Sequence, residues 1–182
     1  MRNKPEPDTT LDSAPRSASP PRGAQLDGGA RTEQLQMFAT PQTSRTSDDY
    51  WTPKWLFDAM GVTFDLDVAC PPEGPHFTPT KNYYTKADDG LTQPWYGRVW
   101  MNPPYSKPAP WVHKFLEHGN GIALTLNSKS KWFDMVWADP RVHLVQMPQN
   151  FAFHQGRIPW VNVLWAIGDE NIEAISKIGR VR

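Results

Sequence analysis

The sequence predicts an α/β fold with a mostly parallel sheet. Short apolar runs typical of β-strands alternate with amphipathic runs typical of helices, which is the pattern of strands joined by helical crossovers. One run, Gly121–Leu126, is almost wholly apolar, as expected for a strand that helices cover on both faces. Another, Val99–Met101, ends just before Pro103 and Pro104, which cannot continue a paired strand.

The first element of the folded part is predicted to be a helix over residues 53–60. Thr52 followed by Pro53 is typical of a helix N-terminus, because threonine caps the helix and proline suits its first position. Gly61 stands where the helix should end. We expect three apolar side chains on the buried face of this helix: Trp55, Leu56 and Ala59.

A strand is predicted next. Residues 62–69 alternate apolar and polar side chains as far as Asp67, and the prolines after Cys70 end the run. Residues 81–85 are expected to form a short second strand, and residues 88–91 have the composition of a turn. An acidic side chain therefore stands at the carboxyl end of the first predicted strand.

Helices and strands alternate again after the two prolines. The amphipathic run closed by Gly119 predicts a helix with Trp111 and Phe115 facing inward. The predicted elements of this part are a helix over 110–118, a strand over 121–126, a helix over 131–137, a strand over 142–147 and a terminal antiparallel pair formed by 151–157 and 161–167.

Composition divides the 182-residue chain into two parts. Residues 1–46 are rich in Pro, Ser, Thr and Arg, with Phe38 as the one aromatic side chain, so they cannot bury enough apolar surface to offset the entropy of folding. We expect a disordered tail over 1–46 and one domain over 47–182. No run has the character of a signal peptide or a membrane span, so the sequence predicts a soluble cytoplasmic protein.

The numbers of cysteine, histidine and charged residues exclude some kinds of site and limit how the chain could bind nucleic acid. One cysteine excludes an internal disulfide and a cysteine-based zinc site, and no histidine or carboxylate cluster has metal-ligand spacing, so no metal site is expected. The 19 basic and 19 acidic residues cancel, so a surface that binds nucleic acid must come from uneven placement of the basic residues. Four basic residues are candidates for DNA contact, although they also suit an ordinary solvated face: Lys107, Lys129, Lys131 and Arg157.

The segment after the strand at 99–101 carries the most specific chemistry. It offers the side-chain carbonyl of Asn102, the main-chain carbonyl of Pro103 and the flat ring of Tyr105. Two acceptors and a stacking surface suit a planar amine, because such a group has two N–H bonds and a flat face. The alternative is a plain strand that ends in a proline turn.

Several further stretches accompany this one, and together they resemble a known family. The stretches are Thr52–Phe57, Phe64–Ala69, Tyr83–Leu91, Trp95 and Asn102–Ser106. Over residues 50–168 their order and spacing resemble the phage-type DNA N6-adenine methyltransferases, which use S-adenosylmethionine. The resemblance implies a Rossmann-like S-adenosylmethionine-dependent methyltransferase fold, with a compact, mostly parallel sheet, in a protein of a phage, a prophage or a restriction-modification system.

The resemblance also implies roles for individual residues. Asn102, Pro103, Pro104 and Tyr105 correspond to the catalytic motif, in which two carbonyls hold the target amine and the tyrosine stacks on a flipped adenine. The residues implied at the methionine end of the cofactor are Trp51, Thr52 and Pro53. The residues implied after the first strand are Asp67, Ala69 and Cys70, with Asp67 on the amino group or ribose, and Asp89 is implied near the adenine of the cofactor.

Two features depart from the expected pattern. Cys70 and two prolines replace the usual Gly-x-Gly turn, which leaves the close approach of backbone to cofactor in doubt. Between Asp67 and Asn102 there is no room for a segment that reads bases, so residues 150–160, with Arg157, are the remaining candidate. The DNA partner can be single- or double-stranded, and a monomer and a weak dimer both stay open.

Three other interpretations remain open. The same motif serves enzymes that methylate protein glutamine, whose amide is also planar. Relatives that act on the N4 atom of cytosine more often carry serine where this chain has Asn102. A catalytically silent DNA-binding module of the same fold is the third alternative, and the missing glycine turn favours it.

Overall fold

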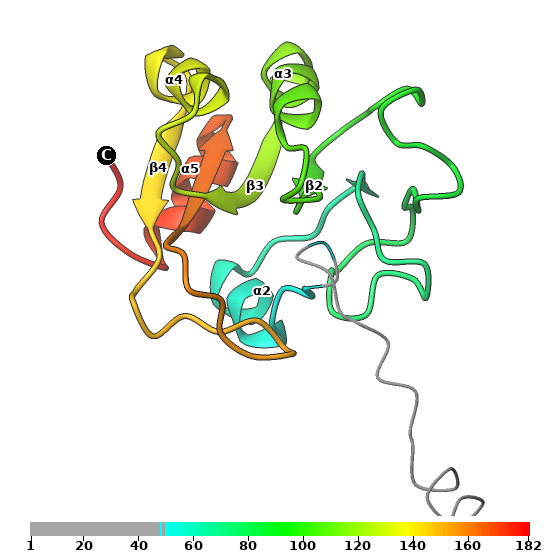
Figure 1. The fold of residues 1–182 in the computed structure, drawn as a ribbon, viewed down its shortest axis with the longest axis horizontal. Coiled ribbons are helices and arrows are strands. Elements are labelled where there is room, and N and C mark those ends of the chain that lie inside the picture. The colour runs from blue at the N-terminus through cyan, green and yellow to red at the C-terminus, as the bar shows by residue number, and fades with distance from the viewer. Residues whose placement is uncertain (1–47, 49) are drawn as a thin grey trace, which may run out of the picture. The chain divides into compact units, whose positions relative to one another are not determined.

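A computed structural model describes residue 48 and residues 50–182. This part is a five-stranded sheet with helices on both faces (Figure 1). The strands are β1 (Leu66–Asp67), β2 (Val99–Met101), β3 (Gly121–Leu126), β4 (His143–Gln146) and β5 (Asn162–Ile167). The helices are α2 (Lys54–Met60), α3 (Ala109–His118), α4 (Lys131–Ala138) and α5 (Asp169–Ser176). The expected tail over residues 1–46 lies outside the described residues.

The sheet is mixed, with the strand order β1-β2-β3-β5-β4. β1, β2 and β3 are parallel neighbours, whereas β5 lies between β3 and β4 and is antiparallel to both. The prediction of a mostly parallel sheet is therefore wrong in its second half. The predicted partner of β5 was also wrong, because residues 151–157 form only an isolated bridge between Phe153 and Gly156, and β4 pairs with β5 instead.

Alternate residues of β2 face opposite sides of the sheet, as the pleat requires. Trp100 faces α2, where its ring lies 4.8 Å from that of Phe57. α5 covers the same face. Met101 faces the other side, which α3 and α4 cover, and there the rings of Phe115 and Trp165 are 4.7 Å apart. Because helices cover both faces of the sheet, β3 and β5 are almost wholly apolar.

The helix predicted over residues 53–60 exists, but its start and its buried face differ from the prediction. α2 begins at Lys54, and Pro53 is the extended N-cap residue, without a side-chain cap. Thr52 does not cap the helix, because its hydroxyl accepts a hydrogen bond from Asn102 instead. The buried side chains are Leu56, Phe57 and Met60, while Trp55 is 47% exposed and Ala59 is also exposed. Gly61 ends the helix with φ +66°, as predicted.

Two other elements differ from the predictions. The strand predicted over residues 62–69 is regular only at Leu66–Asp67, and residues 81–85 contribute a single bridge from Tyr83 to Asp67. Helix α5 was not predicted, although Asp169 and Glu170 in its first turn are the acidic signal of a helix start. No helix in residue 48 or residues 50–182 is long and apolar enough to cross a membrane.

Candidate functional site

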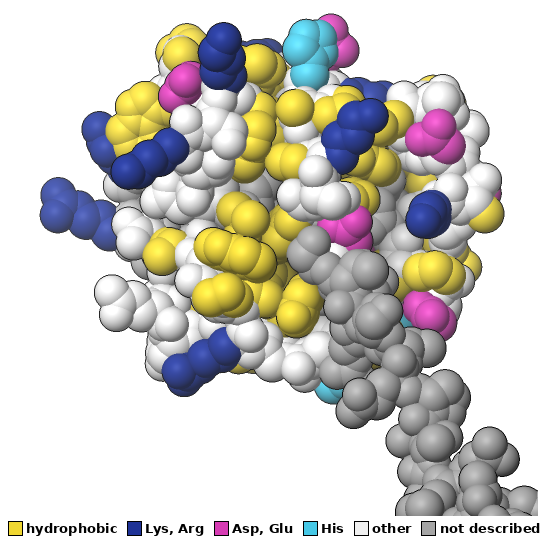
Figure 2. All heavy atoms as spheres, viewed as in Figure 1, with side chains coloured by type: hydrophobic (Ala, Val, Ile, Leu, Met, Phe, Trp, Pro, Cys, Tyr) yellow, Lys and Arg dark blue, Asp and Glu magenta, His cyan; other side chains and the backbone are white. Residues whose placement is uncertain are grey.

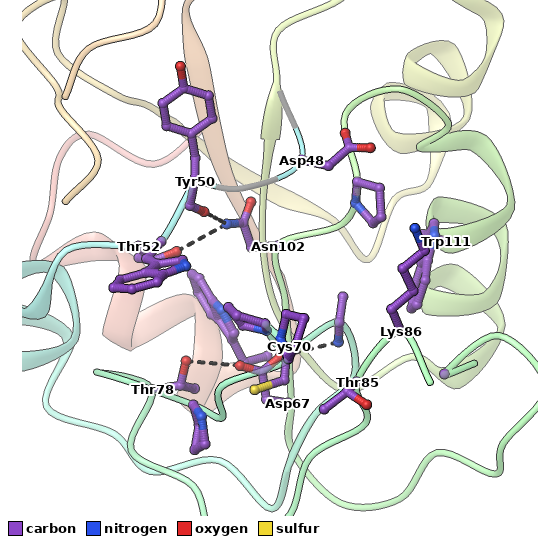
Figure 3. Close-up of a pocket in the computed structure, with 18 of the residues that line it drawn as sticks. Asp48, Tyr50, Thr52, Asp67, Cys70, Thr78, Thr85, Lys86, Asn102 and Trp111 are labelled. Carbon is purple, nitrogen blue, oxygen red and sulfur yellow. Dashed lines mark hydrogen bonds between the residues drawn. The ribbon is translucent and has the colours of Figure 1, made fainter. Parts of the chain in front are cut away.

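A cavity of about 530 Å³ opens at the carboxyl ends of β1 and β2. These strands are parallel, so their ends meet at one edge of the sheet, which is where open α/β sheets bind ligands. The residues that line the cavity come from four segments of the chain, which lie within 48–52, 67–78, 85–91 and 100–111. In Figure 3, Asn102 and Tyr50 lie at one end of the cavity, Asp67 and Thr78 at the other, and Lys86 with Trp111 along a third side.

Asp67 brings a buried carboxyl group to the cavity. Its side chain is 3% exposed, and it accepts hydrogen bonds from the Thr78 hydroxyl at 2.9 Å and from the Ala69 backbone N–H at 3.2 Å. Burial raises its pKa to about 7, and the two hydrogen bonds only partly oppose that shift. A cation beside this carboxyl group would favour its charged form and lower the pKa again.

The prolines after β1 lead into a loop that folds back over the end of the strand. Ala69 and Cys70 line the cavity, and so does the loop that continues through His76 and Thr78. Burial raises the pKa of the Cys70 thiol, and the nearby acid Asp67 raises it further, so this thiol stays protonated.

Trp51 anchors this loop to a distant part of the chain. Its ring stacks on His76 at 3.5 Å and faces His154 at 5.6 Å on a nearly parallel plane. The backbone of Trp51 also pairs with residues 154 and 155, since its carbonyl accepts from the His154 N–H at 3.0 Å and its N–H donates to Gln155 Oε1 at 2.8 Å. Trp51 and Thr52 line the cavity, while Pro53 is buried outside the lining.

Asn102 directly follows β2, and its amide nitrogen faces Tyr50 and Thr52. Nδ2 donates to the Tyr50 carbonyl at 2.9 Å and lies 3.4 Å from Thr52 Oγ1 (Figure 3). A backbone carbonyl can only accept, so the nitrogen of the amide must be on this side. Among the residues that the structure describes, no donor contacts Oδ1, so this oxygen remains an available acceptor on a residue that lines the cavity.

The two prolines after Asn102 have different positions. Pro104 lines the cavity, and its carbonyl accepts a hydrogen bond from the Lys107 N–H at 3.2 Å. Pro103 is buried outside the lining, and its carbonyl has no hydrogen-bond donor among the residues that the structure describes. The Pro103 carbonyl therefore keeps its capacity to accept a hydrogen bond.

Tyr105 lies beside the cavity, not within its lining. Its hydroxyl accepts a hydrogen bond from Asn162 Nδ2 at 3.0 Å, and its ring meets the edge of Phe153 at 6.3 Å. Burial raises the pKa of this phenol above its ordinary value, so the group stays neutral. Asn162 was not among the predicted residues, and no local pattern marks it, because it lies 57 residues away along the chain.

Asp89 lines the cavity within the predicted turn and adopts φ +52°, a left-handed conformation that is uncommon outside glycine. Its neighbour must be glycine, because a Cβ atom on Gly90 would lie 2.2 Å from the Val68 carbonyl oxygen. The six-membered ring of Trp111 packs over the same position. Asp89, Gly90 and Trp111 form one wall of the cavity, and the backbone of this wall lies directly against Val68, the residue after β1.

Lys114, which is partly buried, holds this wall in place through hydrogen bonds. Lys114 on α3 donates from Nζ to the carbonyls of Gly90, Leu91 and Gln93 at 3.1, 2.7 and 2.5 Å. The same ammonium lies 5.0 Å from the centre of the Trp95 ring, whose Nε1 also donates to Gly90. Desolvation lowers the pKa of Lys114, although Asp89 and Glu117 oppose the shift. Sequence reasoning missed Lys114, because a lysine on an amphipathic helix is usually a solvated one.

The predicted DNA contacts fall into two groups. Lys107 lines the mouth of the cavity, together with Lys86, which was not predicted. Lys129, Lys131 and Arg157 are exposed outside it. In the described part of the chain, no group of three or more His, Cys, Asp and Glu side chains could hold a metal ion.

Two comparisons with known proteins found similar sequences. Residues 40–172 match the family model described as DNA N-6-adenine-methyltransferase (Dam). A DNA N-6-adenine-methyltransferase of Haemophilus phage HP1 is 38% identical over 111 residues, which are 54% of this chain and 62% of the relative. The chain thus spans about 62% of the length of that curated relative. No solved structure matches the chain.

Proposed function

Because the chain belongs to the DNA N-6-adenine-methyltransferase (Dam) family, we propose that it transfers a methyl group from S-adenosylmethionine to the N6 amine of an adenine in DNA. The family resemblance inferred from the sequence is confirmed by the family match. The observation that carries the proposal is the orientation of Asn102, whose free amide oxygen belongs to the same cavity as the buried carboxyl of Asp67.

The cavity suits the proposed cofactor in size and in charge. Its volume of about 530 Å³ lies within the usual range for sites that hold molecules of this size. Asp67 is the acid that would pair with the cationic amino group, and Thr78 and the Ala69 N–H orient its carboxylate. The wall formed by Asp89, Gly90 and Trp111 would hold the adenosine half. We therefore propose a Rossmann-like methyltransferase fold, in which the site occupies the crevice at the ends of β1 and β2.

S-adenosylmethionine supplies an electrophilic methyl group on sulfur, and the chain's own residues would prepare the nucleophile. The N6 amine is a poor nucleophile because its lone pair is delocalised into the ring. Hydrogen bonds from its two N–H groups to Asn102 Oδ1 and to the Pro103 carbonyl would favour a pyramidal nitrogen with its lone pair aimed at the methyl group. Holding the two reactants in line would supply much of the rate enhancement.

Tyr105 is proposed to stack on the target base from beside the cavity. Its ring is held in one orientation by Asn162 at the hydroxyl and by Phe153 at the edge. A fixed aromatic ring loses little entropy when a base stacks on it. The base would therefore enter between Asn102 and Tyr105, while the cofactor occupies the cavity behind Asn102.

A DNA-binding surface is proposed next to this entrance. Asn162 pairs with Leu126, and the Asn127 N–H donates to the Val161 carbonyl at 2.8 Å, so the loops that follow β3 and precede β5 lie side by side. These loops and the start of α4 carry the exposed basic residues Lys129, Lys131 and Arg157 and the exposed Trp160. Figure 2 shows a face with exposed hydrophobic side chains at the centre and both basic and acidic side chains around them, and the basic ones are available to phosphates.

The decisive test is transfer of radiolabelled methyl groups from S-adenosylmethionine to unmethylated DNA, followed by digestion to nucleosides. The proposal predicts N6-methyladenine in the digest with the wild-type chain. It predicts no product with Asn102→Ala, which should bind the cofactor with an affinity within about twofold of wild type. Label in N4-methylcytosine or in protein would favour a different substrate. Cofactor binding without any transfer, or no cofactor binding at all, would contradict the proposal.

Two further expectations from the sequence remain proposals. We propose that the catalytic domain comprises residues 47–182, and that it acts in the cytoplasm of a bacterium or a phage-infected cell, where its DNA substrate lies.

A further inference from the structure

We infer that Asp48 and residues 50–52, here called the entry segment, position the catalytic loop, which comprises residues 102–106, and that Thr52, which also lines the cavity, holds the Asn102 amide in place. The inference rests on the proposed methyl transfer. It assigns a positioning role to two side chains, Thr52 and Asp48, that lie about 50 residues before the loop they contact.

The first observation is the pair of acceptors around the Asn102 amide. The Tyr50 carbonyl, at 2.9 Å from Nδ2, takes one hydrogen of the amide, and Thr52 Oγ1, at 3.4 Å, is placed to take the other. Thr52 is 6% exposed, so water cannot readily replace its hydroxyl. Both partners come from the entry segment. The Tyr50 carbonyl can only accept, so it selects the orientation of the amide that leaves Oδ1 for the substrate, and the Thr52 hydroxyl adds a second contact that holds the amide in place.

The second observation is a contact at the other end of the same loop. The carboxylate of Asp48 accepts hydrogen bonds from the Ser106 N–H at 3.0 Å and from the Ser106 hydroxyl at 2.7 Å. The entry segment therefore contacts the loop at its first residue, Asn102, and again at Ser106. The two contacts span the double proline that lies between them.

The catalytic loop needs such support because of its own sequence. Pro103 and Pro104 have no N–H group, so they cannot donate the backbone hydrogen bonds that stabilise ordinary turns. Among the described residues, one backbone hydrogen bond involves the loop, from the Lys107 N–H to the Pro104 carbonyl. Contacts from another part of the chain are therefore needed to fix the direction of the Asn102 side chain.

The entry segment is rigid enough for this role. The ring of Trp51 stacks on His76 and His154, and its backbone N–H and carbonyl form hydrogen bonds with residues 155 and 154. Tyr50 and Thr52 flank this anchored residue directly. Their acceptor atoms are consequently held in place when the Asn102 amide donates to them.

The orientation matters because a rotated amide reverses the chemistry. If Asn102 turned by half a rotation, its NH₂ group would face the N6 amine, and two donors would then oppose each other. Losing the Thr52 hydroxyl removes one of the two contacts that hold the amide against the entry segment. The loss should slow methyl transfer more than it weakens cofactor binding.

Thr52→Val is the main test, since valine keeps the shape of threonine without the hydroxyl, and Thr52→Ser is the matched variant that keeps the hydroxyl. The kcat for DNA methylation is measured at saturating cofactor and DNA, and the Kd for S-adenosylmethionine by calorimetry without DNA. We expect Thr52→Val to lower kcat roughly tenfold with Kd within about twofold of wild type, and Thr52→Ser to keep more than about a third of the activity.

Asp48→Ala tests the second contact, with Asp58→Ala as its control. Asp58 is an exposed acid on α2 that pairs with Lys54, so its removal changes the charge equally without touching the loop. We expect Asp48→Ala to lower kcat several-fold at unchanged Kd, and Asp58→Ala to have no effect. Equal losses in the two variants would contradict the positioning role of Asp48.

A spectroscopic measurement separates this inference from the proposed function. The NH₂ signals of Asn102 in a ¹⁵N NMR spectrum are identified by their loss in Asn102→Ala. Thr52→Val should shift these signals and speed their hydrogen exchange, even if no methyl transfer to DNA is found. Unchanged signals, or a Thr52→Val variant that weakens cofactor binding while keeping kcat, would overturn the inference. If Thr52→Val fails to fold, Thr52→Ala is compared with Thr52→Ser in the same way.

Discussion

The hydroxyl of Thr78 donates a 2.9 Å hydrogen bond to the carboxylate of Asp67, and this contact joins the proline-rich loop to the end of β1. A glycine turn usually brings backbone close to the ligand at this point of the fold. In this chain a side-chain hydroxyl from a loop that folds back orients the acid instead. The carboxylate of Asp67 is therefore held in one orientation although the chain lacks a glycine turn.

The buried Asp67 makes stability depend on pH. Burial raises its pKa to about 7 in the folded protein, whereas in the unfolded chain it has the ordinary value of 3.8. A raised pKa means that the folded state binds the proton more tightly, so the free energy of unfolding falls as pH rises from about 4 to about 7. Replacing Asp67 with Asn should remove this fall, which amounts to at most about 4 kcal/mol. Urea unfolding of both proteins at pH 5 and pH 8, without ligand, measures the difference; an equal pH dependence in the two proteins would contradict it.

The same carboxyl group should make cofactor binding depend on pH. If the carboxylate pairs with the cationic amino group, affinity should rise between pH 5 and pH 7, by up to about tenfold for each unit, because the proton must leave first. Calorimetric titration with S-adenosylmethionine across this range measures the trend. The Asp67→Asn variant should bind weakly and show a flat profile, and a flat profile in wild type would exclude the pairing.

Asn102→Asp should be impaired although it keeps an acceptor oxygen. One carboxylate oxygen would face the Tyr50 carbonyl at the position where Nδ2 now lies 2.9 Å away, and two acceptors repel each other there. A protonated carboxyl can donate to that carbonyl, so the activity of the variant relative to wild type should rise as pH falls from 8 to 6. Methylation assays over this range test the prediction, and a constant ratio would contradict it.

Lys114→Met should loosen the wall that includes Asp89 and Gly90. The variant lacks three hydrogen bonds that one ammonium group donates, which should lower the free energy of unfolding by about 2 kcal/mol. The Kd for the cofactor should rise several-fold, while kcat at saturating cofactor changes little. Lys81→Met, which removes an exposed lysine, is the matched control. A loss of kcat without a change in Kd would contradict the assigned role.

The basic residues beside the cavity should contribute to DNA affinity by neutralising phosphates. Arg157→Gln, Lys129→Gln and Lys131→Gln should each weaken binding at low salt and reduce the slope of log K against log salt concentration by about one for each phosphate that the variant no longer neutralises. Arg180→Gln, an exposed residue of the C-terminal segment, is the control. Fluorescence anisotropy with labelled duplex and single-stranded DNA, at several salt concentrations, measures the slopes and shows which form binds.

Local sequence patterns predicted most of the regular elements correctly. β3 and α4 lie within one residue of their predicted bounds, and α3 ends where Gly119 takes up φ +74°. These features depend on hydrophobic periodicity and on glycine at helix ends, both of which act over a few residues. The place of β5 between β3 and β4 did not follow from such patterns. Strand order depends on which edges pair, and the pairing joins residues far apart in the chain.

Local patterns and tertiary contacts also divide the features of the site. The sequence by itself determined that Asp67 lies near the end of one strand and that Asn102 follows another, because prolines end both strands. Only the tertiary structure decided what surrounds them: Tyr50 on the amide of Asn102, Asn162 on the hydroxyl of Tyr105, and Lys114 on the turn at Gly90. These hydrogen bonds join residues that are 52, 57 and 24 positions apart. Hydrogen bonds over such separations form only when the packed core brings distant segments together, so no local pattern can reveal them.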